Sequence, residues 1–265
     1  MNILFTFFSY KIFNIFYYFK YKIIYNEKLY ISHQEQKFFK FNLNRNLGLL
    51  KLNQLKVLYN FLENPSSSEH QIMFSALSIE NNNTINNILE IGTYDGSNAF
   101  LLSKLFPSAS ITTIDLKDDN QDFLNFYNRD DPKKLEEFIK KRNQILEPIK
   151  KISFVQQNSI NLINENKKFD LIWVDGAHGY PVVTVDISNS IRLLSNGGIM
   201  MCDDVFINQN FNMDKMYNSI ATFETLNSFK EEGLINLELF FKRIDKSNNA
   251  VPKYRKFIAY VHKKF

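Results

Sequence analysis

The chain has 265 residues, enough for one sizeable α/β domain with appendages around a single core. Its 32 basic and 28 acidic residues give a formal net charge of +4 without a dense Lys/Arg stripe, so nucleic acid is not an expected partner. The single cysteine, Cys202, excludes an internal disulfide, and with no small-residue cleavage site near the start the chain reads as cytoplasmic.

The first thirty residues, Met1–Tyr30, are crowded with phenylalanine, tyrosine and lysine. The uncharged run Ile12–Phe19 is far short of the roughly twenty residues that a membrane span needs. An aromatic and lysine-rich arm over residues 1–25 suits peripheral contact with a membrane surface. The alternative, which we favour, is an arm packed on its own domain or on a second subunit of a homo-oligomer.

Helical patterns follow the arm. Residues 31–63 carry leucines at near-helical spacing, Pro65–Ser68 reads as a turn or helix start, and Gln71–Ile79 reads as a further helix. These helices are expected to form a lid over a substrate crevice. We therefore divide the chain into an N-terminal arm and helical extension, residues 1–80, and a main α/β domain, residues 81–265.

The segment Ile88–Ser97 predicts a buried strand, a glycine turn and the start of a helix. Gly92 and Gly96 allow the backbone to turn tightly against a bulky polar ligand. The next strand, Ser110–Leu116, carries Asp115 near its carboxyl end, about twenty residues after the turn. A carboxylate there is placed to accept hydrogen bonds from the two hydroxyls of a ribose.

The glycine turn differs from the three-glycine dinucleotide fingerprint, because it has only Gly92-x-x-x-Gly96 with Glu90 before it. An acid at that place would repel a diphosphate, whereas it suits a cofactor that carries cationic groups. The segment resembles motif I of the class I S-adenosylmethionine-dependent methyltransferases, whose usual form is Glu-x-Gly-x-x-x-Gly. The residues that this resemblance and the strand ends assign to the cofactor are Glu90, Gly92, Thr93, Tyr94, Asp95, Gly96, Ser97, Asp115 and Ser159.

Several of these residues have alternative roles. Glu90 and Asp115 could cap neighbouring N–H groups, and Asp95 and Ser97 could cap the following helix instead of binding the amino acid portion of the cofactor. Tyr94 could shield the cofactor from water or serve only in packing.

A charged insertion between Asp118 and Asn143 separates the second strand from the third. It includes a predicted helix at Pro132–Asn143, is longer than an ordinary connection, and is expected to help shape the acceptor pocket. The third strand is predicted at Ile152–Gln157, and Ser159 beyond its end would lie near an adenine.

A second group of polar residues follows two further strands. The strand that begins at Phe169 is followed by Asp175 and His178, and a helix is expected over Pro181–Leu194. Gly197 and Gly198 are expected to break this helix before a strand at Ile199–Cys202, which leads directly into Asp203 and Asp204. Asp186, on the helix, is expected to be a solvated residue.

The carboxyl ends of these strands should bring Asp175, Asp203 and Asp204 into one crevice. Three clustered carboxylates repel one another unless a cation neutralises them, and their oxygens suit a hard divalent ion such as Mg²⁺. The alternatives are that Asp203 and Asp204 cap a following helix, and that His178 is a loop histidine bonded to backbone.

The remaining elements predict the edge of the sheet. A helix is expected over Asp214–Lys230, and strands at Leu237–Ile244 and Lys256–His262 suit an antiparallel pair. The predicted fold class is α/β, a Rossmann-like doubly wound sheet of about seven strands, mostly parallel with an antiparallel edge strand, plus an N-terminal helical extension.

The run Asp-Gly-x-His-x-Tyr, a helix, Gly-Gly and a strand ending in Asp-Asp resembles the macrocin-type O-methyltransferase group, over roughly Ile85–Asp204. Members of that group are metal-dependent class I enzymes that modify sugar hydroxyls. The resemblance implies that Asp175, Asp203 and Asp204 bind the metal. It also implies S-adenosylmethionine and a divalent cation as cofactors, with a small-molecule or glycan hydroxyl as acceptor.

The chemistry of such a transfer requires a base near the acceptor hydroxyl. His178 is favoured over Asp175, because an imidazole titrates near neutrality whereas a metal-bound carboxylate is a weak base. Three other functions stay open: a catechol-type O-methyltransferase, a dinucleotide-dependent dehydrogenase or epimerase, and a non-catalytic binding module at a membrane or partner surface. Glu90 and the short glycine turn argue against a dinucleotide.

Overall fold

The computed structural model describes residues 16, 18–59, 68–81, 84–125, 129–208 and 219–264. Most of the aromatic arm, the segment 65–67 and the beginning of the helix expected from residue 214 lie outside these described residues. Among the helices that are described, none has the length and apolar character that a membrane crossing requires.

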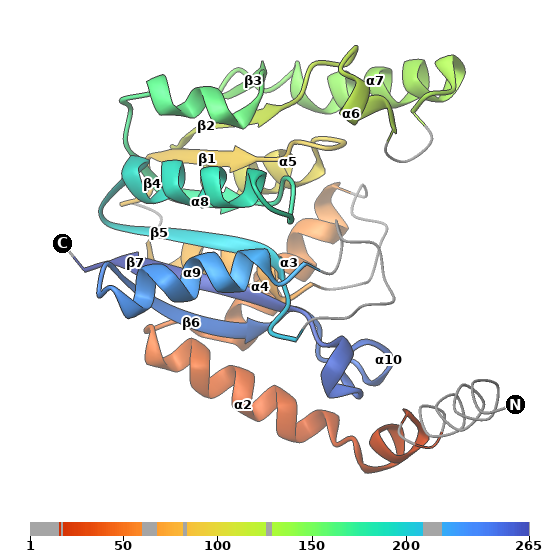
Figure 1. Ribbon diagram of the computed structural model, residues 1–265, viewed down its shortest axis with the longest axis vertical. Coiled ribbons are helices and arrows are strands. Elements are labelled where there is room, and N and C mark those ends of the chain that lie inside the picture. The colour runs from red at the N-terminus through yellow and green to blue at the C-terminus, as the bar shows by residue number, and fades with distance from the viewer. Residues whose placement is uncertain are drawn as a thin grey trace, which may run out of the picture.

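The described residues form one seven-stranded sheet flanked by helices (Figure 1). The strands are β1 (Asn87–Ile91), β2 (Ser110–Asp115), β3 (Ile152–Gln156), β4 (Phe169–Val174), β5 (Leu194–Val205), β6 (Ile235–Phe241) and β7 (Phe257–Lys263). The α-helices are α2 (Glu27–Lys40), α3 (Arg45–Tyr59), α4 (Glu69–Glu80), α5 (Ser97–Leu105), α6 (Gln121–Asn125), α7 (Pro132–Leu146), α8 (Val182–Leu193), α9 (Ala221–Glu231) and α10 (Lys246–Asn249). Two short 3₁₀ helices, η1 (Ser159–Asn164) and η2 (Pro252–Tyr254), complete the described elements.

The strand order is β3-β2-β1-β4-β5-β7-β6. The first five strands of this order pair in parallel, and β7 runs antiparallel to both β5 and β6. The predicted Rossmann-like sheet with an antiparallel strand near one edge is therefore confirmed. Because β6 is antiparallel to β7, it points in the same direction as the parallel strands. The order reverses between β1 and β4, and a ligand crevice is expected at such a switch point.

The side chains of the strands alternate between two hydrophobic cores, as the period of a β-strand requires. Ile88 and Trp173 belong to the core beneath α4 and α5, whereas Leu89 and Val174 belong to the core beneath α8 and α9. In Figure 1, α8 and α9 lie in front of the sheet and α4 lies behind it. This near-continuous apolar character is typical of parallel strands that are covered on both faces.

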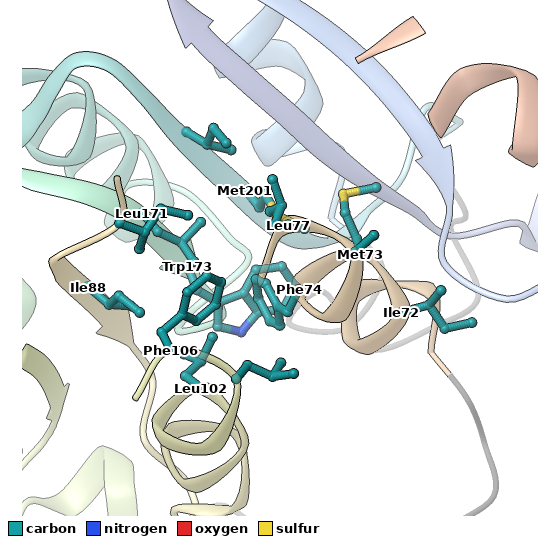
Figure 2. Close-up of a cluster of buried hydrophobic side chains, with 14 of the residues drawn as sticks. Ile72, Met73, Phe74, Leu77, Ile88, Leu102, Phe106, Leu171, Trp173 and Met201 are labelled. Carbon is teal, nitrogen blue, oxygen red and sulfur yellow. The ribbon is translucent and has the colours of Figure 1, made fainter. Parts of the chain in front are cut away.

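Helix α4, from the predicted N-terminal extension, is a full member of the first core. Its side chains Phe74 and Leu77 lie against Trp173 of β4 and Phe106 at the end of α5 (Figure 2). The ring centroids of Phe74 and Trp173 are 5.2 Å apart at an interplanar angle of 82°, the edge-to-face arrangement that aromatic pairs favour. This packing holds the middle of the sheet from behind.

Helix α2 runs along β6, the last strand of the sheet (Figure 1). The Gln34 amide donates to the carbonyl oxygen of Phe241 at 3.0 Å and accepts from its N–H at 3.1 Å. Gln34 also donates to Glu69, which forms a buried ion pair with Arg45 at 2.6 Å. Helices α2, α3 and α4 are thereby tied to one another and to the sheet.

Two predicted boundaries differ from the structure. Gly197 and Gly198 do not break the helix, because α8 ends at Leu193 and β5 already begins at Leu194. Leu194 pairs with Phe169 of β4, and the register shifts before the pairing resumes at Ile199, so the glycines lie inside an irregular strand. The helix expected to be continuous to residue 230 begins only at Ala221 within the described residues, because residues 219 and 220 are not helical.

Candidate functional site

A cavity of about 550 Å³ opens at the carboxyl ends of the strands, over the switch point between β1 and β4. This size is ordinary for a small-molecule site. The predicted site residues that line it are Gly92, Tyr94, Asp115, Ser159, Asp175, His178, Asp203 and Asp204. The other predicted residues, Glu90, Thr93, Asp95, Gly96 and Ser97, are not among the lining residues. No described residue of α2, α3 or α4 lines the cavity either, so the role of a lid stays a prediction.

The turn after β1 requires glycine at two positions. Gly92 has φ +100°, and a Cβ atom there would lie 2.3 Å from the carbonyl oxygen of Asp175. The Asp175 N–H in turn donates to the carbonyl oxygen of Ile91 at 2.8 Å, so β1 and β4 end in close contact. Gly96 has φ +80°, and a Cβ atom there would lie 2.9 Å from the side chain of Leu146 on α7. Both glycines therefore serve close backbone approach.

Glu90 lies beneath this turn, fully buried. Its carboxylate accepts hydrogen bonds from Asn98 Nδ2 at 2.7 Å and from Thr113 Oγ1 at 2.5 Å. Thr93 Oγ1 lies 2.6 Å from Thr113 Oγ1 and extends the network to the turn. Burial raises the pKa of Glu90 to about 7, although the two hydrogen bonds oppose this rise. Glu90 thus supports the turn from inside.

Asp115 faces the cavity from the end of β2. Its Oδ2 accepts from the Tyr94 N–H at 2.9 Å and its Oδ1 accepts from the Leu116 N–H at 2.8 Å, which fixes the orientation of the carboxylate. Burial raises the pKa of Asp115 above its ordinary value. Asp95, by contrast, accepts from the Ser97 N–H at 3.0 Å at the start of α5, which is the capping contact considered as its alternative role.

The charged insertion builds the wall beside Asp115. Phe123 and Arg129 line the cavity there, and the Arg129 guanidinium lies 4.0 Å from the centre of the Phe123 ring. Arg142 of α7 is buried and forms a bidentate ion pair with Asp118 at 2.7 and 2.8 Å. The insertion therefore shapes the Asp115 end of the cavity rather than the opposite end, because α6 and α7 directly follow β2.

The acids Asp175, Asp203 and Asp204 meet at the opposite end, as predicted, but lysines accompany them. Lys242 Nζ donates to Asp203 Oδ2 at 2.6 Å and also to Asp204 Oδ1. Lys256 Nζ donates to Asp204 Oδ2 at 2.6 Å. Lys242 is only 8% exposed and itself lines the cavity.

The electrostatics follow from these contacts. Burial alone would raise the pKa of Asp203, yet the Lys242 ammonium holds it well below the usual range. Burial alone would lower the pKa of Lys242, yet the neighbouring carboxylates raise it. Asp175, without a lysine bonded to it among the described residues, has its pKa raised by desolvation and by the negative charge of Asp203. Lys242 and Asp203 therefore form a buried ion pair that is charged at neutral pH.

This donor set does not fit a ready-made divalent metal site. Ammonium groups bind three of the four carboxylate oxygens of Asp203 and Asp204. No group of three or more potential metal ligands is assembled among the described residues. A divalent ion would have to displace Lys242 before it could bind the two aspartates.

His178 lies beside the acids and is only 7% exposed. Its Nε2 lies 3.6 Å from Asp175 Oδ1. Burial lowers the pKa of His178, although the negative charges of Asp204 and Asp203 oppose this shift. The imidazole is therefore neutral at neutral pH and can take up a proton.

Three residues of the site were missed from sequence. Asp186 was expected to be solvated, and this is wrong: it is 1% exposed and lines the cavity, because its face of α8 packs under Gly176. Burial raises the pKa of Asp186 to about 6. Lys242 and Lys256 flank the facing ends of β6 and β7. Lys242 follows the carboxyl end of β6, so it lies at the same edge of the sheet as the three acids. The sequence could not show this, because the direction of β6 depends on β7 lying between β5 and β6.

Part of the chain is similar to a known protein family. Residues 89–205 match a family model described as "Methyltransferase domain". This segment contains the glycine turn and each of the three acids. No curated protein matches the chain.

Solved structures share the fold at low sequence identity. SAH-bound methyltransferase PaMTH1 of Podospora anserina is 18% identical with a TM-score of 0.51, and the match covers 82% of this chain and 88% of that one. The O-methyltransferase from Bacillus cereus in complex with SAH is 14% identical with a TM-score of 0.51, covering 82% and 90%. Cofactor-bound Rv0187 from MTB is 14% identical with a TM-score of 0.52, covering 81% and 88%. The predicted class I methyltransferase fold is confirmed.

Proposed function

Because residues 89–205 match the model of a methyltransferase domain, we propose that this protein is an enzyme. It transfers a methyl group from S-adenosylmethionine to a hydroxyl oxygen of a small molecule. One observation carries this proposal: a single cavity holds a nucleoside-type half, with Gly92 and Asp115, and a proton-accepting half, with His178. The SAH-bound relatives of the same fold support S-adenosylmethionine as the donor.

The cofactor half follows the strand ends. The carboxylate of Asp115 is fixed by the N–H groups of Tyr94 and Leu116. It accepts hydrogen bonds from the ribose hydroxyls of the cofactor. Ser159 lines the adenine end, and Asp186 beneath it offers carboxyl oxygens that lack a hydrogen bond of normal geometry among the described residues. Gly92, which lines the cavity at the end of β1, lies beside the amino acid portion of the cofactor.

The transfer itself requires an oxygen that loses its proton as it attacks. The acceptor oxygen forms a bond to the methyl carbon while the bond from that carbon to sulfur breaks, and the electron pair of the broken bond stays on sulfur. The proton of the acceptor hydroxyl goes to an imidazole nitrogen of His178, which is neutral at neutral pH. Asp175 lies beside this histidine and stabilises the imidazolium that forms.

The acceptor class is a sugar or glycoside. The acceptor half is lined by ionisable side chains, namely Asp175, His178, Asp203, Asp204 and Lys242. Such walls favour an acceptor with several hydroxyl groups over an apolar ring, because buried charged groups need hydrogen-bond partners. The resemblance of Asp-Gly-x-His-x-Tyr to the macrocin-type group points to the same class.

A divalent cation has no step in this mechanism. It would supply a Lewis acid at the acceptor oxygen, but the described donor set holds lysine ammonium groups where it would bind. The sequence prediction of Mg²⁺ started from three carboxylates that need a positive charge, and lysine ammonium groups supply that charge to two of them.

Calorimetric titration of the purified protein tests the donor. We expect S-adenosylmethionine and S-adenosylhomocysteine to bind and NAD not to bind. Asp115→Ala should abolish measurable binding, whereas the control Asp119→Asn, on an exposed turn nearby, should leave it unchanged. Binding of NAD in place of S-adenosylmethionine would refute the proposal.

A panel of methyl glycosides and catechol, with formation of S-adenosylhomocysteine as the readout, tests the acceptor class. The assigned roles would be supported if the wild type methylates a glycoside and His178→Ala does not, while both bind S-adenosylmethionine with the same affinity. Turnover of catechol alone would refute the sugar assignment.

A further inference from the structure

We infer that the ammonium group of Lys242 takes the place of a divalent cation in this site and donates a hydrogen bond to the acceptor oxygen. The part that concerns the acceptor rests on the proposed function. The part that concerns the cation rests on the contacts of Lys242 alone.

Lys242 is held in place through its backbone as well as its side chain. Its N–H donates to the carbonyl oxygen of Lys256 at 2.9 Å, and its carbonyl oxygen accepts from the Glu69 N–H at 2.9 Å. Glu69 is itself fixed by the buried ion pair with Arg45. The lysine therefore projects from a rigid junction of β6, β7 and α4 rather than from a loose surface loop, as a preorganised charge should.

The charge of the cluster argues against an added metal. Asp175, Asp203 and Asp204 carry three negative charges when ionised, and Lys242 and Lys256 carry two positive ones. A divalent ion would turn this small negative excess into a positive one. By displacing Lys242, it would also break two buried charge-assisted hydrogen bonds, and such bonds are among the strongest in proteins.

The ammonium group of Lys242 can supply the positive charge that a divalent cation would provide at the acceptor oxygen. Two of its three N–H groups are bonded to Asp203 and Asp204 in the described part of the chain, and the third is available to a ligand in the cavity that it lines. As His178 removes the acceptor proton, this N–H stabilises the negative charge that develops on oxygen. Lys242 keeps its protons throughout, so the proton count of the transfer does not change.

A metal titration of the chelator-treated wild-type protein is the decisive test. We expect no binding of Mn²⁺ by calorimetry or paramagnetic resonance. We also expect the same unfolding temperature in EDTA and in Mg²⁺, and unchanged affinity for S-adenosylmethionine in EDTA. Stoichiometric binding of Mn²⁺ by the wild type, or loss of cofactor binding in EDTA, would overturn the inference.

Substitution of the lysine adds a second readout. Lys242→Met should expose the two aspartates, so this variant should bind Mn²⁺ although the wild type does not, and its transfer rate should fall about 10²–10³-fold. Lys242→Arg keeps a charge and should bind no Mn²⁺. Lys246→Met, an exposed lysine nearby, is the matched control and should behave as the wild type. If Lys242→Met binds no more Mn²⁺ than the wild type while folding normally, the inference fails.

The two proposals fail separately. Absence of S-adenosylmethionine binding would refute the proposed function and leave the Mn²⁺ result intact. Binding of Mn²⁺ by the wild type would refute the role of Lys242 and leave the methyl donor intact. If Lys242→Met does not fold, the wild-type titration alone decides.

Discussion

Gly92→Ala tests whether the end of β1 must lie against β4. The new methyl group would stand 2.3 Å from the Asp175 carbonyl oxygen, about 1 Å closer than carbon and oxygen tolerate. The backbone oxygen cannot rotate away as a flexible side chain could. The strands must therefore separate, and the 2.8 Å hydrogen bond from Asp175 N–H to the Ile91 carbonyl lies at that junction.

The magnitude follows from three contributions. A left-handed backbone costs alanine roughly 1–2 kcal/mol, the weakened hydrogen bond about 1 kcal/mol, and overpacking between two buried strand ends about 1–3 kcal/mol. We expect a loss of at least about 3 kcal/mol in the free energy of unfolding. The same displacement moves the floor of the cofactor half, so binding of S-adenosylmethionine should be lost as well.

Gly197→Ala is the matched control. Gly197 also has a left-handed φ, +75°, but a Cβ atom there would meet nothing within 4 Å. Gly197→Ala should therefore lower the free energy of unfolding only by the backbone contribution, roughly 1–2 kcal/mol. Urea unfolding and calorimetric titration of both variants measure the difference. Equal losses of stability, or unchanged cofactor affinity in Gly92→Ala, would refute the reasoning.

Three further predictions concern charged groups. Burial raises the pKa of Glu90 to about 7, so the native state holds a proton that the unfolded chain releases, and stability without cofactor falls as pH rises from about 5 to 7. Glu90→Gln removes this loss, so its free energy of unfolding in urea should exceed that of the wild type by about 1–3 kcal/mol at pH 8 and by little at pH 5. An equal effect at both pH values would contradict the prediction. Arg45→Met leaves Glu69 buried without its partner and should cost about 3–5 kcal/mol, whereas Lys40→Met at the exposed end of α2 should cost less than about 1 kcal/mol, both by thermal unfolding. Asp115→Asn should weaken S-adenosylmethionine binding at least about tenfold by calorimetry, because the negative charge that accepts from the ribose hydroxyls is lost. The unfolding temperature should also fall, because the single amide oxygen can accept from only one of the Tyr94 and Leu116 N–H groups.

Much of the fold could be predicted because local pattern and long-range packing agree. The strand residues alternate between two apolar cores, and glycines with positive φ mark the turn at Gly92 and Gly96. The rule that ligands bind at carboxyl strand ends then placed Asp115 and Asp175 correctly in one cavity.

The rest depended on contacts between segments distant in sequence. Glu90 has the position of a cofactor ligand in the motif, but partners on β2 and α5 enclose it. Asp186 looks like any polar residue of an amphipathic helix until the packing of α8 is known. The argument that clustered carboxylates need a positive charge was sound. It did not say that a lysine directly after β6 would supply the charge, because that requires knowing that β7 inserts between β5 and β6.

The hydrogen bonds between Gln34 and Phe241 have a consequence for solubility. A side-chain amide presents one donor and one acceptor in the arrangement that a neighbouring strand would offer, so it occupies part of the exposed border of β6. Lys37 and Lys40 add charge along the same border, with Glu238 as their partner. A chain that begins after residue 40 would bare this strand to other molecules, and we expect it to associate through added β-strands even where the cavity stays intact.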